Sequence, residues 1–488
     1  MNGKRVDVAG VQVATGHFIN GARVDASQTF EDRSPLDWNV KLADVSRGNG
    51  ADADAALRAA LGAFPAWAAK SAAERAAYLH RLADLIDENV ERLAAVECLD
   101  MAMLLESLQK RVISRGARNF RAYADLAVDY HSRRWDSNGT HNAVMRMPAG
   151  PTVVITPWNA PFMLSTWKCA PALAAGNTVI LKPAEWAPLS CSVLMDLVDE
   201  AGFPPGVFNL VQGIGEEVGA ALVADHRVRR ISFTGSPETG RAIGVAAARN
   251  LTPFTAELGG KGPFIVFADA DLDAAAAKAA VMYDDAGQVC LAGTRLLVED
   301  SAKHEFLARF EAATAAHVLG DSRDPSTTIS PLIHPEHLAR VEGFVERARA
   351  HGDRVVFGGE RLRGDGLWYR PTLIEPHSND AEIVQHEVFG PVLTFQTFAD
   401  EDEAISLANS TPYGLSAIVY TSDQARAERL GERVRAGTIG VNTFLVRDLT
   451  APFGGTGISG IGREGGDYAL DFYSDLKTFQ VKEDTTHG

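Results

Sequence analysis

One cysteine in the sequence has the surroundings of a reactive thiol. Cys290 stands between Gly287 and Gly293, and glycines let other stretches of backbone come close to a side chain. A thiolate held there by backbone dipoles would be a nucleophile. The four cysteines form no CxxC pair and no spacing suited to zinc, so we expect no metal site. The alternative for Cys290 is a buried, inert thiol.

Glu257 is the carboxylate best suited to proton transfer. Its neighbours Ala256 and Leu258 are apolar, and two glycines follow. An apolar flank raises the pKa of a carboxyl group towards neutrality, where a general base is most useful. The alternative is a structural glutamate in a salt bridge.

The segment 231–240 has the pattern of a phosphate-binding turn. A short apolar run leads into Gly235 and Ser236, and an apparent helix starts at Pro237. Free backbone N–H groups and the positive end of the helix dipole would then face a pyrophosphate. The segment is not the GxGxxG fingerprint, and an ordinary turn in which Ser236 caps the helix is the alternative.

Lys182 and Glu185 directly follow a predicted strand, at the sheet edge where ligands usually bind. A carboxylate in this place can accept hydrogen bonds from both hydroxyls of an adenosine ribose, and it repels a 2′-phosphate. The pair therefore favours NAD over NADP. A solvated charge pair on a loop is the alternative.

These residues need a scaffold, and the sequence predicts two α/β units. After Pro151, β-branched runs alternate with helix-like segments, which is typical of a parallel sheet covered on both faces. The predicted strands are 152–155, 178–181, 207–211 and 230–233, and the predicted helices are 164–175, 191–201 and 216–224. A second alternation, with apolar runs at 264–267, 295–298 and 418–420, predicts a second α/β domain.

Two further patterns lie outside these units. The Ala-rich segment 51–127 predicts amphipathic helices, and Asn138-Gly139 predicts a hairpin turn. Alternating residues at 479–482 predict a terminal strand that pairs with another sheet or with a neighbouring subunit.

The bulk properties exclude several classes of protein. A chain of 488 residues exceeds the size of about 300 residues at which a single core stops growing, so we expect two or more domains. The net charge of -16 and the lack of a basic run argue against a nucleic-acid partner. No apolar stretch reaches the roughly 20 residues that span a bilayer, and no secretory signal pattern is visible. We expect a cytoplasmic protein without a membrane partner.

Taken together, the motifs of the chain resemble those of the aldehyde dehydrogenase superfamily over nearly its whole length. They are, in order, Phe18–Gly21, Thr156–Asn159, Lys182–Glu185, Phe233–Ser236, Glu257–Lys261, Gly287–Cys290, Glu387–Pro391, Pro452–Gly455 and Gly462–Glu464. Gly262 and Gly457 depart from the pattern, in which Ser and Lys are usual. Neither position transfers a proton, so the departures concern loop contacts.

The resemblance implies an α/β fold of three parts: a Rossmann-like NAD-binding domain, an α/β catalytic domain and a small β oligomerisation hairpin. We expect the NAD-binding domain at 1–128 and 149–258, the oligomerisation segment at 129–148 and 473–488, and the catalytic domain at 259–472. The hairpin would extend the sheet of a partner, which implies a homodimer or a homotetramer.

The resemblance also implies an NAD-dependent oxidation of an aldehyde to a carboxylic acid. Cys290 matches the nucleophile that forms a thiohemiacetal and then a thioester, and Glu257 matches the general base. Asn159 matches the amide that forms the oxyanion hole with the backbone N–H of Cys290. The implied cofactor contacts are Trp158, Lys182, Glu185, Gly235, Ser236, Glu387 and Phe389.

Within the superfamily, the chain looks like the hydroxymuconate-type semialdehyde dehydrogenases, through the segments 446–449 and 462–468. Arg115 and Arg447 are then expected to bind a substrate carboxylate, and Phe162 to contact the substrate. The implied substrate is a carboxylate-bearing semialdehyde from aromatic catabolism. Each arginine could instead hold a loop through a carboxylate such as Asp448.

Other functions stay open. The enzyme could have broad specificity for aliphatic or aromatic aldehydes. A dehydrogenase that acylates coenzyme A would not need a base at Glu257, and a non-catalytic protein on this fold would be expected to lose Cys290 or Asn159. All three residues are present.

Overall fold

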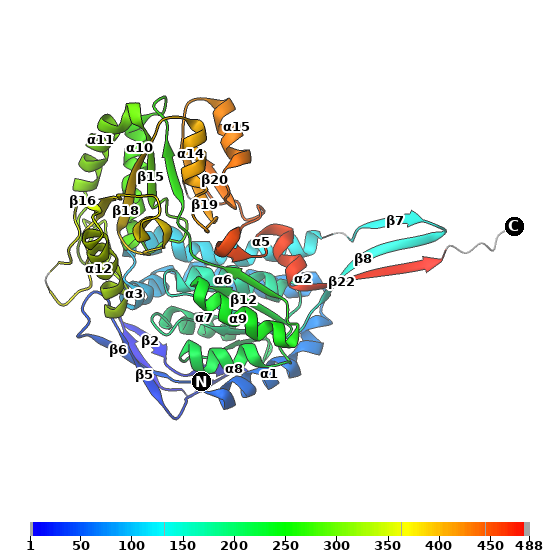
Figure 1. Ribbon diagram of the computed structural model, residues 1–488. Helices are drawn as coiled ribbons and strands as arrows, with labels where there is room; N and C mark the ends of the chain where they lie inside the picture. The colour runs from blue at the N-terminus through cyan, green and yellow to red at the C-terminus, as the bar shows by residue number, and fades with distance from the viewer. Residues whose placement is uncertain (1–2, 131, 363, 445, 483–488) are drawn as a thin grey trace.

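The computed structural model describes residues 3–130, 132–362, 364–444 and 446–482. Two large sheets with helices on both faces form the body, and a long hairpin projects from it (Figure 1). Among the described helices, none combines the length and the apolar character that crossing a bilayer requires.

The first sheet has eight described strands and a parallel centre. In spatial order they are β21 (Gly460–Ile461), β13 (Phe254–Glu257), β12 (Arg230–Thr234), β9 (Thr152–Ile155), β10 (Val179–Lys182), β11 (Phe208–Leu210), β3 (His17–Ile19) and β4 (Ala22–Val24). The strands from β13 to β11 run parallel, whereas β21, β3 and β4 pair antiparallel.

Both faces of this sheet are covered, because its strands are apolar on each side. Val153 packs into the core of one face and Val154 into that of the other, as expected for neighbouring residues of a strand. The first core includes α1 (Gly50–Ala68), α8 (Ala220–Ala224) and α9 (Pro237–Asn250); the second includes α6 (Pro161–Ala174), α7 (Leu189–Glu200), α2 (Ala72–Glu88) and α5 (Ile113–Asp129).

The second sheet has seven described strands, and only its edge strand β16 pairs antiparallel. Their order is β16 (Arg354–Phe357), β17 (Thr372–Glu375), β18 (Val392–Phe398), β15 (Arg295–Glu299), β14 (Pro263–Val266), β19 (Ser416–Tyr420) and β20 (Thr438–Val441). The helices packed on it are α10 (Leu272–Ala280), α11 (Lys303–Ala315), α12 (Pro335–Ala350), α14 (Glu401–Ala408) and α15 (Gln424–Arg433).

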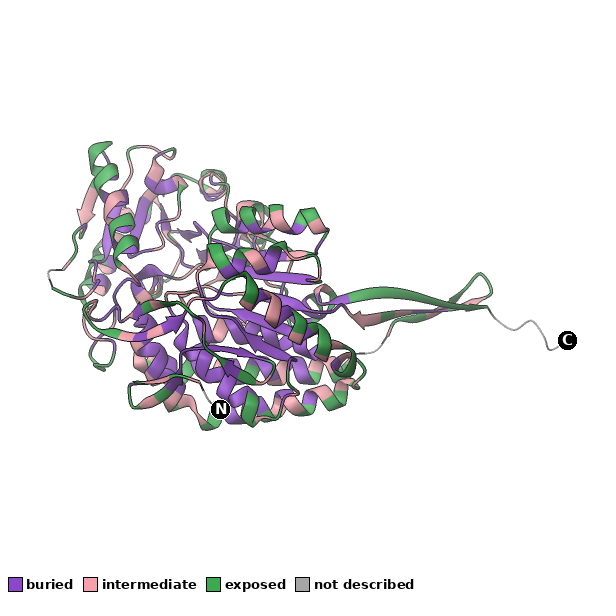
Figure 2. Ribbon diagram, turned by 90° about the horizontal axis from the view of Figure 1, so that it is seen from below, coloured by how far each residue is buried: buried purple, intermediate pink, exposed green. Residues whose placement is uncertain are grey.

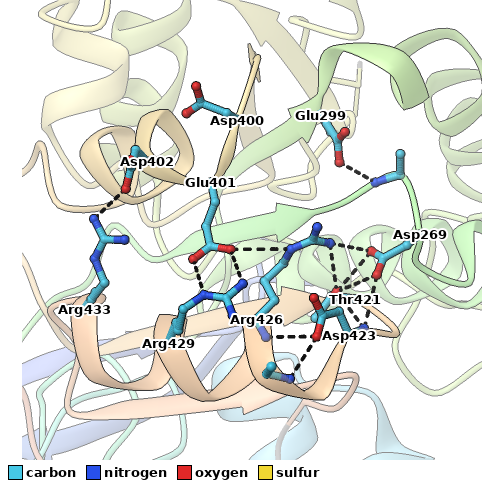
Figure 3. A network of polar contacts seen from close by, with 12 residues as sticks. Asp269, Glu299, Asp400, Glu401, Asp402, Thr421, Asp423, Arg426, Arg429 and Arg433 are labelled. Carbon is cyan, nitrogen blue, oxygen red and sulfur yellow. Dashed lines mark hydrogen bonds and ion pairs between the residues drawn. The ribbon is translucent and has the colours of Figure 1, made fainter.

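An ion-pair network fixes the outer helices of this second unit (Figure 3). On α15, Arg429 binds Glu401 of α14 at 2.7 Å, and Arg426 binds Asp269 after β14 at 2.9 Å. Because these charges are paired and largely at the surface, the network ties neighbouring elements together and contributes modestly to stability.

The projecting hairpin joins segments from both halves of the chain. Strands β7 (Arg134–Ser137) and β8 (Thr140–Pro148) are linked by Asn138 and Gly139, which have φ values of 54° and 66°. This is the turn that an Asn-Gly pair favours. Strand β22 (Ser474–Lys482) pairs along the whole of β8, so the predicted terminal strand is confirmed and is longer than 479–482.

The remaining described α-helices and β-strands complete the fold. They are β1 (Arg5–Val8), β2 (Val11–Ala14), β5 (Thr29–Arg33), β6 (Lys41–Ser46), α3 (Val90–Met101), α4 (Leu105–Ser107), α13 (Glu382–Gln385) and α16 (Gly466–Phe472). The first four predicted strands are confirmed to within one residue at each end. The predicted helix 216–224 differs, because it begins as a π-helical turn (Gly215–Gly219) before α8.

Candidate active site

The loop that crosses from one sheet to the other brings the two reactive candidates together. Strand β13 of the first sheet ends at Glu257, and β14 of the second begins at Pro263. A Cβ atom on Gly260, within this loop, would lie 2.5 Å from the carbonyl oxygen of Cys290. The glycine is therefore required for the loop to touch the backbone of the cysteine.

Cys290 is the accessible thiol among the four cysteines, since the other three are buried and Cys290 is half-buried. Burial of the thiol raises the pKa of Cys290 to about 12, and the charges of Glu387 and Glu257 act in the same direction. The backbone N–H groups of Cys290 and Leu291 oppose this rise by stabilising the thiolate. The predicted backbone dipoles are thus in place, but nearby carboxylates favour the neutral thiol.

Glu257 is a buried carboxyl group whose two oxygen atoms have no hydrogen-bond partner in the described part of the chain. Burial raises its pKa well above the usual range, and the charge of Glu464 adds to the rise. Lys168, Arg463 and Arg447 partly oppose it. The prediction that its environment raises the pKa of Glu257 is confirmed.

Glu464, next to Glu257, is by contrast fully bonded. It accepts a hydrogen bond from the indole Nε1 of Trp167 at 2.7 Å and from the hydroxyl of Ser232 at 3.1 Å, and it pairs with Lys168. Glu464 is therefore satisfied by three partners, whereas Glu257 has none in the described part of the chain.

Asn159 reaches across from the first sheet to the loop of the nucleophile. Its Nδ2 donates to the carbonyl oxygen of Gln288 at 2.9 Å. The Gln288 side chain is itself held, because its Nε2 donates to Pro331 O at 3.3 Å and its Oε1 accepts from Ile333 N at 3.0 Å. The amide of Asn159 is thus oriented beside Cys290.

The backbone that leads into Cys290 is strained. Asp285, Ala286 and Gly287 are three consecutive left-handed residues, with φ values of 51°, 53° and 68°. A left-handed conformation costs a non-glycine residue about 1 to 2 kcal/mol. A Cβ atom on Gly287 would lie 2.2 Å from the carbonyl oxygen of Gly390, so only glycine fits there. The bonds of Gln288 keep this conformation in place.

Glu387 also contacts the crossing loop. Its Oε1 accepts a hydrogen bond from the backbone N–H of Gly260 at 2.8 Å, and burial raises its pKa to about 7. A Cβ atom on Gly259 would collide with its other oxygen. Gly259 and Gly260 therefore make room for Glu387 as well as for the backbone of Cys290.

Side chains of helix α12 form hydrogen bonds with the backbone of residues 387–389. Arg340 donates to the carbonyl oxygens of Glu387, at 2.8 Å, and of Val388, and the His337 ring lies 2.7 Å from the Phe389 oxygen. Trp158 completes the cluster, with its ring 5.3 Å from His337 and 5.4 Å from Phe389. Three consecutive carbonyl groups are thus bonded to one helix.

A second region, at the carboxyl edge of the first sheet, has the groups that a dinucleotide needs. Lys182, the last residue of β10, binds Glu185 at 2.8 Å, and their side chains are 2% and 23% exposed. Ser236 accepts a hydrogen bond from Thr239 N and so caps α9, as the alternative interpretation predicted. The cap uses one helical N–H, and Gly235 leaves the turn without a side chain.

The two candidate arginines flank one tryptophan. The Arg447 guanidinium lies 4.7 Å from the ring of Trp167 and 4.3 Å from that of Phe453, and Arg115 lies 6.0 Å from Trp167. Burial, and then the charge of Arg447, lowers the pKa of Arg115 to about 10. Asp448 accepts hydrogen bonds from Thr450 instead of holding Arg447.

Phe162, the expected substrate contact, lies in the interior of the first unit. Its side chain is fully buried in the core of the first unit. A Cβ atom on Gly116 would lie 2.5 Å from its ring, so Phe162 packs directly beneath α5. It supports the helix that carries Arg115, and its contact with a substrate stays a prediction.

Sequence reasoning missed Trp167, Lys168, Gln288 and Arg340. One signal was available, since Lys168 is a cation within the otherwise apolar helix α6. Such a residue is rarely buried without a partner. Gln288 and Arg340 act through contacts with residues far away in the sequence, and no local sequence pattern predicts such contacts.

Comparison with known proteins agrees with the motifs. The model of the "Aldehyde dehydrogenase family" matches residues 23–479. The 2-hydroxymuconic semialdehyde dehydrogenase of Pseudomonas sp. (strain CF600) is 41% identical, over 96% of this chain and 99% of its own length. The 2-aminomuconic semialdehyde dehydrogenase of Danio rerio is 39% identical, over 96% and 98%.

The fold has a close counterpart among solved structures. The crystal structure of betaine aldehyde dehydrogenase from Staphylococcus aureus in complex with NAD+ superposes with a TM-score of 0.94 at 36% identity, covering 97% of this chain and 96% of that one. The expected α/β architecture and the resemblance to semialdehyde dehydrogenases are confirmed. The chain belongs to the aldehyde dehydrogenase family and is an oxidoreductase of that kind.

Proposed function

We propose that this protein oxidises an aldehyde to a carboxylic acid with NAD, through a thioester on Cys290 that water hydrolyses with Glu257 as the base. The observation that carries the proposal is the crossing loop. At Gly260 this loop packs against the backbone carbonyl of Cys290, and at its start stands the carboxyl group of Glu257, which has no hydrogen-bond partner in the described part of the chain.

In the first half of the reaction, the Cys290 thiol gives its proton to solvent and its sulfur bonds to the carbonyl carbon. The carbonyl oxygen becomes an alkoxide, which the Asn159 amide and the Cys290 N–H are suited to stabilise. Loss of one such donor typically costs about 3 to 4 kcal/mol of transition-state stabilisation. Bound NAD would supply the acceptor for the hydride of this carbon, whose loss turns the Cys290 adduct into a thioester.

In the second half, Glu257 takes a proton from water as the water oxygen bonds to the thioester carbon. The carbon–sulfur bond then breaks and the sulfur takes the proton from Glu257, which releases the carboxylic acid and restores the Cys290 thiol and the Glu257 carboxylate. Glu257 must be ionised for this step, and its raised pKa means that it reaches this form only at a pH above the usual range of a carboxyl group. A base in this place favours hydrolysis over transfer to coenzyme A.

The residues at the sheet edge fit NAD. Glu185 is a partly exposed acceptor for ribose hydroxyls, and Gly235 and Ser236 precede the α9 N-terminus, which favours a pyrophosphate. Lys182 completes the ribose site, and a carboxylate at Glu185 disfavours the 2′-phosphate of NADP. Near Cys290, Glu387 offers a carboxylate for the second ribose, and Trp158 and Phe389 wall the cofactor.

The substrate that the arginine pair suits is a semialdehyde with a carboxylate. Arg447 and Arg115 are like charges held near each other, and Nη2 of Arg447 is buried with no partner in the described part of the chain. A substrate carboxylate between the two arginines would offset the repulsion of their charges and accept a hydrogen bond from Nη2 of Arg447. The two semialdehyde dehydrogenases named above are similar over nearly their full lengths.

A substrate panel tests this function. NADH formation is followed by absorbance with carboxylate-bearing semialdehydes, aliphatic aldehydes and benzaldehydes, each with and without coenzyme A. We expect the highest kcat/KM for the semialdehydes, no dependence on coenzyme A, and no turnover by C290A. Turnover by C290A would overturn the proposed chemistry, whereas equal kcat/KM for all classes would overturn the proposed substrate.

The arginines are tested separately. Arg447→Met should raise KM for a carboxylated aldehyde far more than for a neutral aldehyde of the same length, and Arg447→Lys should retain part of the difference. Equal rises for both aldehydes would show that Arg447 only supports its loop.

A further inference from the structure

Trp167 contacts both the arginine pair, Arg447 and Arg115, and the buried carboxylate of Glu464. One indole ring lies against the guanidinium groups of Arg447 and Arg115, at 4.7 and 6.0 Å. The N–H of the same ring donates to Glu464 at 2.7 Å. Trp167 is itself buried, so water does not separate the two groups along this path.

A second connection runs through the backbone. The ring of Phe453 lies under Arg447, and its backbone forms two hydrogen bonds with that of Glu464. The Phe453 N–H donates to the Glu464 carbonyl oxygen at 2.6 Å, and the Glu464 N–H donates to the Phe453 carbonyl oxygen at 2.7 Å. In the same turn, a Cβ atom on Gly454 would lie 2.8 Å from Oε1 of Glu257. The candidate substrate site and the base therefore share one loop.

Three cations and one carboxylate act on Glu257 from the elements around it. Lys168 of α6 is neutralised by Glu464, and Arg463 donates to the carbonyl oxygens of Gly455 and Gly462. Arg447 differs from these, because its buried Nη2 has no partner in the described part of the chain. An anion bound nearby would therefore compensate the charge of Arg447 more than that of Lys168 or Arg463, which already have partners.

We propose that Arg447 links substrate recognition to the base: a carboxylate bound at the arginine pair makes Glu257 hold its proton more tightly. This inference rests on the proposed function for the identity of the anion. The inference adds that Arg447 and Arg115 distinguish carboxylated from neutral aldehydes in the hydrolysis step as well as in binding.

The direction follows from electrostatics. Arg447 favours the ionised form of Glu257, so compensation of its charge raises the pKa of Glu257. At an effective dielectric constant of about 20, a unit charge about 10 Å away shifts a pKa by about one unit. Because the base must be ionised, the acid limb of hydrolysis moves to higher pH when the substrate bears a carboxylate.

The test is an infrared pH titration of the Glu257 carboxyl band, which is assigned by its absence in E257Q. The probes are glutaramate, a carboxylate with an amide in place of the aldehyde, and glutaramide, its neutral counterpart. We expect glutaramate to raise the midpoint by about one pH unit and glutaramide to leave it unchanged. An unchanged midpoint with glutaramate bound, as measured by calorimetry, would overturn the inference.

The variants separate this inference from the substrate proposal. Arg447→Met should have a midpoint raised by a similar amount without any probe, and Arg447→Lys should keep the wild-type midpoint. Arg133→Met is the matched control, because Arg133 also lies over an indole ring, that of Trp135, but on the hairpin. If glutaramate does not bind, the substrate proposal fails. A wild-type midpoint in Arg447→Met would refute the coupling itself.

Discussion

At the scale of single residues, the surroundings of Cys290 combine two opposed influences. Backbone N–H groups stabilise its thiolate, while burial and the charges of Glu387 and Glu257 favour the thiol. The nucleophile is therefore protected until the charge balance around it changes. Neutralising either carboxylate should make the thiol more acidic.

Glu387→Gln is the corresponding test. The substitution removes a negative charge near the sulfur, so it lowers the pKa of Cys290 and increases the thiolate fraction below this pKa. We expect alkylation by iodoacetamide at pH 8 to be about tenfold faster, which corresponds to a shift of about one unit. Glu305→Gln, on the surface of α11, should react at the wild-type rate; an equal rate in both variants would contradict the account.

Asn159→Ala tests the amide donor. Without Nδ2, the alkoxide loses one of its two proposed hydrogen bonds, so kcat should fall by about 100-fold to 1000-fold. Binding of NAD, followed by quenching of tryptophan fluorescence, should change little. A kcat within threefold of wild type would show that Asn159 contacts only Gln288.

Much of the candidate site was predictable at this scale, since Cys290, Glu257 and Asn159 lie in local motifs. The role of Phe162 stays a prediction, but its full burial was not predictable, because the sequence does not reveal which side of α6 faces the core. The partners of Glu464 were not predictable, because Trp167 and Lys168 meet it only after the first sheet and its helices have packed together.

At the scale of elements, helix α12 determines where Glu387 lies. Its hydrogen bonds to the carbonyl oxygens of residues 387 and 388 come from one side chain, Arg340. The helix begins at Pro335, after the cap His334, in a favourable sequence for initiation. The position of Glu387 thus depends on an element more than forty residues away in sequence, as the separation of 47 for one of these bonds shows.

Arg340→Met should release this segment. We expect the KM for NAD to rise by about tenfold, a loss equal to about 1.4 kcal/mol, which is within the range of a hydrogen bond from a charged donor. Arg340→Lys should recover part of the loss. Arg349→Met is the matched control, because Arg349 lies on the same helix and donates to Gly359 O, at 2.9 Å, away from Glu387. Equal losses in both variants would indicate general destabilisation of α12.

The strands of the first sheet were predictable because β-branched runs are short and bounded, and the Asn-Gly turn was predictable from its backbone preference. Strand β21, with two residues, has no periodicity to detect. Its pairing with β13 places a segment of the expected catalytic range in the first sheet. The domain boundaries at 128, 148, 258 and 472 stay predictions.

At the scale of the whole molecule, the hairpin is the part least covered by the rest of the protein, as Figure 2 shows. Leu476, Phe479 and Val481 of β22 are 58%, 52% and 45% exposed. We infer that this strand contacts a partner subunit in a homodimer or homotetramer, because an exposed apolar strand edge invites pairing.

Phe479→Asp should reduce the assembly to a smaller species in light scattering, since a charge would be buried at the contact. Val40→Asp is the control, because Val40 is a similarly exposed apolar residue, at 45%, away from the hairpin. An unchanged mass in Phe479→Asp would exclude β22 from the interface.

The central claim is that a thioester on Cys290 is hydrolysed with Glu257 as the base. Its most direct test is the intact mass of Glu257→Gln after a single addition of aldehyde and NAD, followed by peptide mapping. The account predicts one equivalent of NADH and one acyl group on Cys290 that decays slowly. NADH formation with no acyl group on the protein, or with an acyl group on another residue, would contradict it.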